Sequence, residues 1–189
     1  MVFLGDSLAA GHGLPSDQAF PALVEGELRQ RGLPVWVLNG GVSGDTTAGG
    51  RARLAWLLRQ QPQVVVLELG ANDGLRGLPL EVIADNLEQI VLESRAAGAR
   101  VLLAGMRLPP SYGEPYATGF AQIYLDLAAR LDVALMPFLL AGVGGRSELN
   151  LPDGIHPNAE GHRLIAAALM PYLEALLTEV ESAMAKEAA

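Results

Sequence analysis

Several residue types are absent or scarce in this chain of 189 residues, and each shortage argues against a class of chemistry. The chain has no cysteine, which excludes disulfides, thiolate nucleophiles and cysteine-ligated metals. Its only lysine is Lys186, close to the C-terminus, which argues against a Walker-type phosphate loop and a buried Schiff-base lysine. Aromatic residues make up only 5% of the chain, which predicts a core built mainly of leucine, valine and alanine.

Basic charge and long apolar runs are scarce too. The chain has 13 basic and 21 acidic residues, a net charge of −8 that argues against a nucleic-acid binder. No apolar run approaches the roughly 18 residues of a membrane span, and no signal peptide precedes the first strand as written. We therefore expect a cytoplasmic protein, or a periplasmic or secreted one if a signal peptide has been removed.

The apolar pattern alternates between short buried runs and amphipathic stretches. Strands are predicted at residues 2–5, 34–39, 63–69, 100–105 and 133–137. Helices are predicted at 17–31, 47–60, 80–97, 115–131 and from 158 onward, with a kink or break at Pro171. This alternation predicts a three-layer α/β/α sandwich with a five-stranded parallel sheet, for which we expect the flavodoxin-like order 2-1-3-4-5. We expect one domain over residues 1–189, with a frayed tail at 181–189.

Polar loops follow the first three predicted strands. Ser7 lies in "GDS", Gly44 in "GGVSGDT" and Asn72 in "GANDG". In the expected strand order the ligand site lies at the carboxyl ends of these neighbouring strands, where the three loops meet. Ser7 is then a candidate nucleophile, and its N–H, the Gly44 N–H and the Asn72 amide are candidate donors to an oxyanion.

A serine nucleophile needs a base, and the chain has three histidines. His12 is interpreted as a loop or rim residue and His162 as a packed or surface residue of the last helix. His156 in "DGIHP" follows Asp153 by three residues, so the carboxylate can orient one ring nitrogen and leave the other facing Ser7. A metal site from Asp153, His156 and His162 is less favoured, because no further strong ligand has suitable spacing.

Taken together, "GDS", "GDT", "GAND" and "DGIHP" resemble the sequence blocks of the SGNH (GDSL-type) hydrolase family. Longer stretches such as "SGDTTAGGRARL" and "MRLPPSYGEPY" are similar to its bacterial branch of arylesterases and multifunctional thioesterase/lysophospholipases. The resemblance implies Ser7 as nucleophile, His156 as base, Asp153 as its orienting residue, and an oxyanion hole from Ser7, Gly44 and Asn72.

The resemblance also implies a mobile loop over the acyl site at residues 74–79, which places Arg76 and Leu78 among the candidate substrate contacts. Leu8, Leu75, Arg107 and Pro109 complete the candidate acyl groove. Asp6 and Asp45 are expected to hydrogen-bond within their loops and hold the geometry. The first strand is shorter than the family pattern, which puts the native start of the chain in question.

The expected activity is hydrolysis of carboxylic esters or thioesters, on aryl ester, acyl-thioester or lysophospholipid substrates, with no metal or organic cofactor. One alternative is a carbohydrate acetylesterase of the same fold, which aromatic platforms would favour; Trp36 and Trp56 fall in strand and helix patterns and are expected in the core. The other alternative is a non-catalytic flavodoxin-like binding module, against which the presence of Ser7, Asn72 and His156 argues.

Overall fold

A computed structural model of the chain describes residues 1–187. Its centre is a five-stranded parallel sheet in the order β2-β1-β3-β4-β5, which confirms the predicted order. The strands are β1 (Val2–Gly5), β2 (Leu38–Gly41), β3 (Val64–Glu68), β4 (Arg100–Ala104) and β5 (Ala134–Met136).

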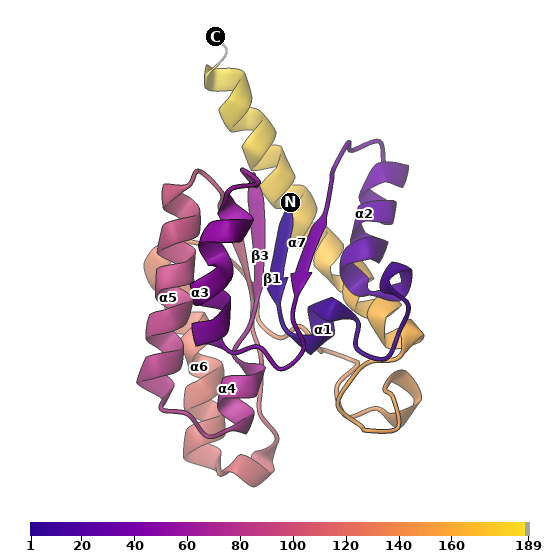
Figure 1. The fold of residues 1–189 in the computed structure, drawn as a ribbon, viewed down its shortest axis with the longest axis vertical. Coiled ribbons are helices and arrows are strands. Elements are labelled where there is room, and N and C mark those ends of the chain that lie inside the picture. The colour runs from indigo at the N-terminus through magenta and orange to yellow at the C-terminus, as the bar shows by residue number, and fades with distance from the viewer. Residues whose placement is uncertain (188–189) are drawn as a thin grey trace.

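Helices cover both faces of this sheet. The α-helices are α1 (Ser7–Ala10), α2 (Phe20–Gln30), α3 (Thr47–Leu58), α4 (Ala71–Leu75), α5 (Leu80–Ala96), α6 (Glu114–Leu131) and α7 (Ala159–Glu187). Short 3₁₀ turns, η1 (Ser16–Gln18), η2 (Pro110–Tyr112) and η3 (Ser147–Leu149), lie in the connections. Figure 1 shows α3, α5 and α6 on one side of the sheet and α2 and α7 on the other, and α2 packs directly on α7.

The two central strands explain why this arrangement is stable. Every residue of β1 and of β3 is buried, and most of their side chains belong to the hydrophobic core. Their carboxyl ends are level, since Gly5 of β1 pairs with Gly41 of β2 on one side and with Glu68 of β3 on the other. The loops that follow these strands therefore leave the sheet at one edge, where α1 and α4 begin (Figure 1).

The second strand differs from its predicted position. It was expected at 34–39 but spans Leu38–Gly41, because the apolar-looking Trp36 is 78% exposed and does not enter the sheet. Glycine is required in β2 by close packing instead. A Cβ on Gly40 would lie 2.8 Å from the Phe3 carbonyl oxygen, and one on Gly41 would lie 2.2 Å from the Ala10 nitrogen.

The last helix also differs from expectation, since α7 continues through Pro171 without a break. Its residues 181–187, expected to fray, are helical, and positions 188–189 of that expected tail lie outside the described residues. In Figure 1 the end of α7 projects beyond the amino ends of the strands. Among residues 1–187, no helix combines the length and the apolar character that crossing a membrane requires.

Both tryptophans are exposed, so the expectation that they belong to the core was wrong. Trp36 accepts a hydrogen bond from the Met1 amino group through its carbonyl, which places it at the amino end of β1, away from Ser7. Trp56 is 53% exposed near the end of α3, the helix whose other end approaches the site. The indole rings are amphipathic and tolerate this position, and neither forms an aromatic platform beside Ser7.

Candidate active site

Ser7 is the first residue of α1, directly after the turn that ends β1. Asp6 caps this helix, since its carboxylate accepts a hydrogen bond from the Leu8 N–H at 2.9 Å. Gly11 ends the helix after one turn in the left-handed conformation, at φ +71°. The result is a rigid one-turn helix that holds the Ser7 hydroxyl at the carboxyl edge of the sheet.

His156 and Asp153 come from the loop before α7 and complete a hydrogen-bonded chain with Ser7. The His156 Nε2 lies 2.9 Å from the Ser7 Oγ, and its Nδ1 lies 2.8 Å from the Asp153 Oδ2. Both distances are within the range of direct hydrogen bonds. The structure thus brings these predicted residues together across 149 positions of sequence in the order that a serine, a base and an orienting carboxylate require.

Asp153 is held by the backbone of its own turn. Its Oδ1 accepts hydrogen bonds from the His156 N–H at 3.0 Å and the Ile155 N–H at 2.8 Å. These bonds, together with the His156 ring, hold the pKa of the exposed Asp153 carboxyl well below its usual range. Asp153 therefore stays ionised and can keep the Nδ1 proton of His156 in place.

Asn72 is linked to the start of α1, where Ser7 lies, through the carboxylate of Asp6. Its amide nitrogen donates to the Asp6 Oδ2 at 3.0 Å, while the other oxygen of Asp6 caps α1. One carboxylate thus ties the loop after β1 to the loop after β3. The expectation that Asp6 acts within the local loop geometry is confirmed, and the structure extends its contacts to Asn72.

Beneath Asp6 lies Glu68, fully buried at the end of β3. Its Oε2 accepts from the backbone N–H groups of Asp6 at 3.1 Å and Ala9 at 3.3 Å. Burial, and secondarily the charge of Asp6, raise the pKa of Glu68 well above its usual range, so we treat it as neutral. Burial also raises the pKa of Asp6. Sequence reasoning missed Glu68, although a single carboxylate inside the apolar run "QVVVLEL" is a detectable signal.

Gly44 sits in the loop after β2 with φ +80°, a left-handed conformation that favours glycine. Its carbonyl accepts a hydrogen bond at 3.0 Å from Arg76, which belongs to the loop after α4. The next residue, Asp45, bonds the Arg53 side chain at 2.7 Å. Arg53 also donates to the Gly5 carbonyl at 3.0 Å, so this unpredicted residue links the Gly44 loop to the end of β1.

Residues 74–79 are joined to the segment around η2 by two tyrosines. The Tyr112 hydroxyl donates to the Leu75 carbonyl at 3.2 Å, and the Tyr116 hydroxyl donates to the Leu78 carbonyl at 2.6 Å. Leu75 is 38% exposed beside these bonds, whereas Leu78 is partly buried against the core. The exposed Leu75 and Arg76 therefore remain the candidate substrate contacts of this loop.

The other candidate contacts occupy different surroundings. Leu8 is only 4% exposed and belongs to the hydrophobic core, so its expected place in a groove was wrong: the side chain at this position of α1 faces inward. The Arg107 guanidinium lies over the Phe138 ring, 5.1 Å from its centroid. Pro109 is exposed and directly precedes η2.

The two remaining histidines have different environments. His162 is buried on α7, where its Nδ1 accepts the Phe20 N–H at 3.1 Å, as expected for a packed helix residue. His12 is exposed, but its ring lies 4.4 Å from that of His156. The sequence contains no indication of the contact between His12 and His156, because this contact depends on how the loop before α7 folds back.

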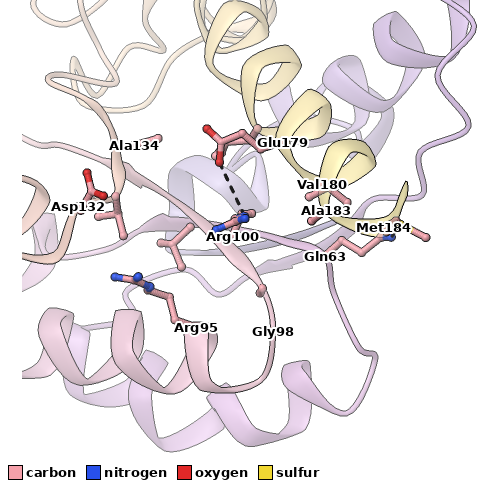
Figure 2. Close-up of a pocket in the computed structure, with 14 residues that line it drawn as sticks. Gln63, Arg95, Gly98, Arg100, Asp132, Ala134, Glu179, Val180, Ala183 and Met184 are labelled. Atoms are coloured by element: carbon pink, nitrogen blue, oxygen red, sulfur yellow. Dashed lines mark hydrogen bonds and ion pairs between the residues drawn. The ribbon is translucent and has the colours of Figure 1, made fainter. Parts of the chain in front are cut away.

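A hollow of about 710 Å³ lies elsewhere, at the amino ends of β3 and β4. Figure 2 shows it between Arg95, Arg100, Asp132 and the last turns of α7, with Glu179 paired to Arg100 at 3.7 Å. It contains no part of the Ser7, His156 and Asp153 cluster, and its Arg100 is already paired with Glu179. We therefore place the candidate chemistry at the carboxyl edge of the sheet.

Comparisons with known proteins agree with this geometry. Residues 3–164 match the model of the GDSL-like lipase/acylhydrolase family. An arylesterase of Vibrio mimicus is 44% identical over 88% of this chain and 84% of its own length. The thioesterase 1/protease 1/lysophospholipase L1 of Escherichia coli K12 is 40% identical over 94% and 84%. A crystal structure of TesA superposes with a TM-score of 0.90 at 42% identity, covering 93% of this chain and 98% of that one.

Proposed function

The chain belongs to the GDSL-like lipase/acylhydrolase family and is an ester hydrolase, and from that premise we propose that Ser7 carries the acyl group in a two-step reaction. The observation that supports this assignment is the 2.9 Å contact between the Ser7 Oγ and the His156 Nε2, backed by Asp153 on the opposite ring nitrogen. Residues 1–189 are proposed to act as one hydrolase domain.

In the first step the Ser7 oxygen attacks the carbonyl carbon of the ester. His156 accepts the hydroxyl proton on Nε2 and later donates it to the leaving alcohol or thiol. Asp153 stabilises the resulting imidazolium, which it can do because its lowered pKa keeps it ionised. In the second step His156 takes a proton from water while the water oxygen adds to the acyl carbon, and His156 then returns the proton to the Ser7 oxygen as the bond to the acyl group breaks and the acid leaves.

The tetrahedral intermediate carries a negative charge that needs preorganised donors. The proposed donors are the N–H groups of Ser7 and Gly44 and the amide of Asn72. The contact of Asn72 with Asp6 supports this role, because it fixes the amide beside the start of α1. The bond from Arg76 to the Gly44 carbonyl likewise fixes the loop that presents the Gly44 N–H.

The proposed substrates are small esters, thioesters or lipids, with aryl ester, acyl-thioester and lysophospholipid types all compatible with the relatives' names. Leu75 and Arg76, both exposed, are proposed to contact the acyl or leaving group, with Leu78, Arg107 and Pro109 around them. The reaction as proposed uses only side chains and water.

The test is hydrolysis of p-nitrophenyl esters from acetate to palmitate by the wild type, Ser7→Ala and a control, Ser182→Ala. Ser182 is exposed on α7, far from the site. We expect Ser7→Ala to abolish turnover while Ser182→Ala keeps it, and the optimum chain length to identify the acyl class. Turnover that survives in a folded Ser7→Ala protein would refute the nucleophile assignment.

A further inference from the structure

His12 contacts the proposed base although the mechanism does not use it. The His12 and His156 ring centroids lie 4.4 Å apart, with a tilt of 38°. The placement follows from the short helix α1: after the left-handed Gly11, the His12 N–H bonds back to the Ser7 carbonyl at 3.0 Å. His12 therefore lies one turn above the nucleophile, on the open side of the site.

Three metal-ligating side chains converge there. One potential ligand atom from each of His12, Asp153 and His156 lies within 4.8 Å of the others. Among the side chains that the structure describes, those of residues 1–186, this is the one cluster of its kind, and its members come from two loops that meet at the site. His12 is exposed, so its side chain can rotate toward a shared ion, whereas Asp153 is exposed but held by its own turn and His156 is half-buried.

We propose that His12, Asp153 and His156 form an inhibitory binding site for a zinc-like divalent cation. Two imidazoles and a carboxylate are a ligand set that Zn²⁺ accepts, with water in the remaining position. Bonds of about 2.0–2.2 Å require the three ligand atoms to draw closer together, which rotation of the exposed His12 side chain toward Asp153 and His156 allows. The inhibitory effect rests on the proposed function, since it acts through the base of that mechanism.

Binding at either nitrogen of His156 stops catalysis. A metal on Nδ1 replaces the proton shared with Asp153, and a metal on Nε2 replaces the hydrogen bond to Ser7. In both cases the lone pair that must accept the Ser7 proton is lost or misplaced. The ion is therefore expected to lower the number of active molecules without unfolding the protein.

The ligand set also selects among ions. Imidazole nitrogen binds Zn²⁺ and Cu²⁺ well, whereas Mg²⁺ and Ca²⁺ prefer oxygen ligands. His162, the only other histidine, is buried with its Nδ1 engaged by Phe20, so it does not compete for a metal in the folded protein.

The first experiment titrates Zn²⁺ against p-nitrophenyl ester hydrolysis in a chelator-free buffer, with Mg²⁺ as the comparison ion. The key variant is His12→Phe, which keeps a ring against His156 and removes both ligating nitrogens. Each protein is scored against its own metal-free rate. We expect micromolar Zn²⁺ to inhibit the wild type, at least about tenfold weaker inhibition of His12→Phe, and none by Mg²⁺. Equal inhibition of both proteins by Zn²⁺ would overturn the proposal.

The second experiment measures Zn²⁺ binding by calorimetry to Ser7→Ala and to the double variant Ser7→Ala, His12→Phe. Calorimetry does not depend on catalytic activity, so it tests the metal site separately from the proposed role of Ser7 as nucleophile. Binding that weakens at least about tenfold without His12 supports the metal site even if Ser7 is not the nucleophile. Binding of equal strength, or none in either protein, refutes the site even if wild-type ester hydrolysis is normal.

Discussion

The buried His162 predicts a specific loss of stability in acid. Its ring is 1% exposed, stacks on Phe20 and accepts the Phe20 N–H on Nδ1. Burial, with a smaller effect of the His156 charge, lowers the pKa of His162 from 6.5 to about 4. The folded protein therefore holds this imidazole neutral at pH values where an unfolded chain binds a proton.

The sign and size of the effect follow from these two values. The contribution of His162 is fully present above pH 6.5 and is lost as the pH falls toward 4, because the unfolded state binds more protons in that interval. At about 1.4 kcal/mol for each tenfold change in proton affinity, the free energy of unfolding falls by about 2 kcal/mol at pH 5 and about 3 kcal/mol at pH 4.

The assay compares the wild type with His162→Gln by urea unfolding at several pH values from 7.5 to 4. Glutamine does not titrate, and its side-chain oxygen can accept the Phe20 N–H. Neutralisation of Asp6 and Glu68, whose pKa values are raised, acts in the opposite direction, since such groups favour the folded state at low pH. These groups are common to both proteins, so the difference between the two curves isolates His162.

We expect the variant to be less stable at pH 7.5, because its packing is imperfect, and its deficit to shrink by about 2 kcal/mol by pH 5. Two parallel curves would refute the reasoning, as they would mean that His162 titrates alike in the folded and unfolded states. A titration of the His162 ring followed by NMR gives an independent check, with a midpoint near 4 expected.

Three further predictions concern the site and its supports. Asn72→Ala should lower kcat by about 10²–10³-fold with little change in KM, and an unchanged kcat would exclude its amide from the oxyanion hole. Glu68→Gln should stay close to wild type in kcat and thermal midpoint, because Glu68 is neutral. Glu68→Ala should lower the free energy of urea unfolding by about 2–5 kcal/mol, because it leaves two buried backbone N–H groups without an acceptor. Equal losses of stability in both variants would contradict a neutral Glu68. Tyr116→Phe should cost about 1 kcal/mol of unfolding free energy by removing the bond to the Leu78 carbonyl, and no loss would show that water replaces it.

The sheet was predictable from sequence where strands are buried on both faces. The runs around β1 and β3 contain little besides apolar residues, and their neighbouring turns mark where they end. The position of the edge strand β2 was not predictable from the sequence, because it is set by close packing against neighbouring residues. Gly40 and Gly41 are poor strand formers by propensity, yet only they allow the chain to approach Phe3 and Ala10 so closely.

The candidate triad was predictable because its members lie in short motifs that resemble those of a known family, and because Ser7 follows a strand that the apolar pattern predicts. Ser7 comes directly after β1, and the spacing of Asp153 and His156 fits a single turn of chain. His12 lies close to Ser7 in the sequence. Its contact with His156, however, depends on the course of residues 138–158, which no local pattern determines. Long connections of this kind bring residues together in the fold, and the apolar periodicity of the sequence does not predict such contacts.

The buried carboxylates of Asp6 and Glu68 hold the site in place, a role that the catalytic sequence motifs do not indicate. Asp6 must remain an acceptor for both Leu8 and Asn72, and it does so in a region where burial disfavours charge. A second ionised carboxylate beneath it would be repelled, so the neutral state of Glu68 is what allows the pair to coexist. Glu68 then uses one oxygen to hold the backbone on both sides of Ser7. The end of β3 thereby positions a nucleophile that follows β1, and a substitution that removes this acceptor, such as Glu68→Ala, should lower activity at Ser7 without any direct contact between the two side chains.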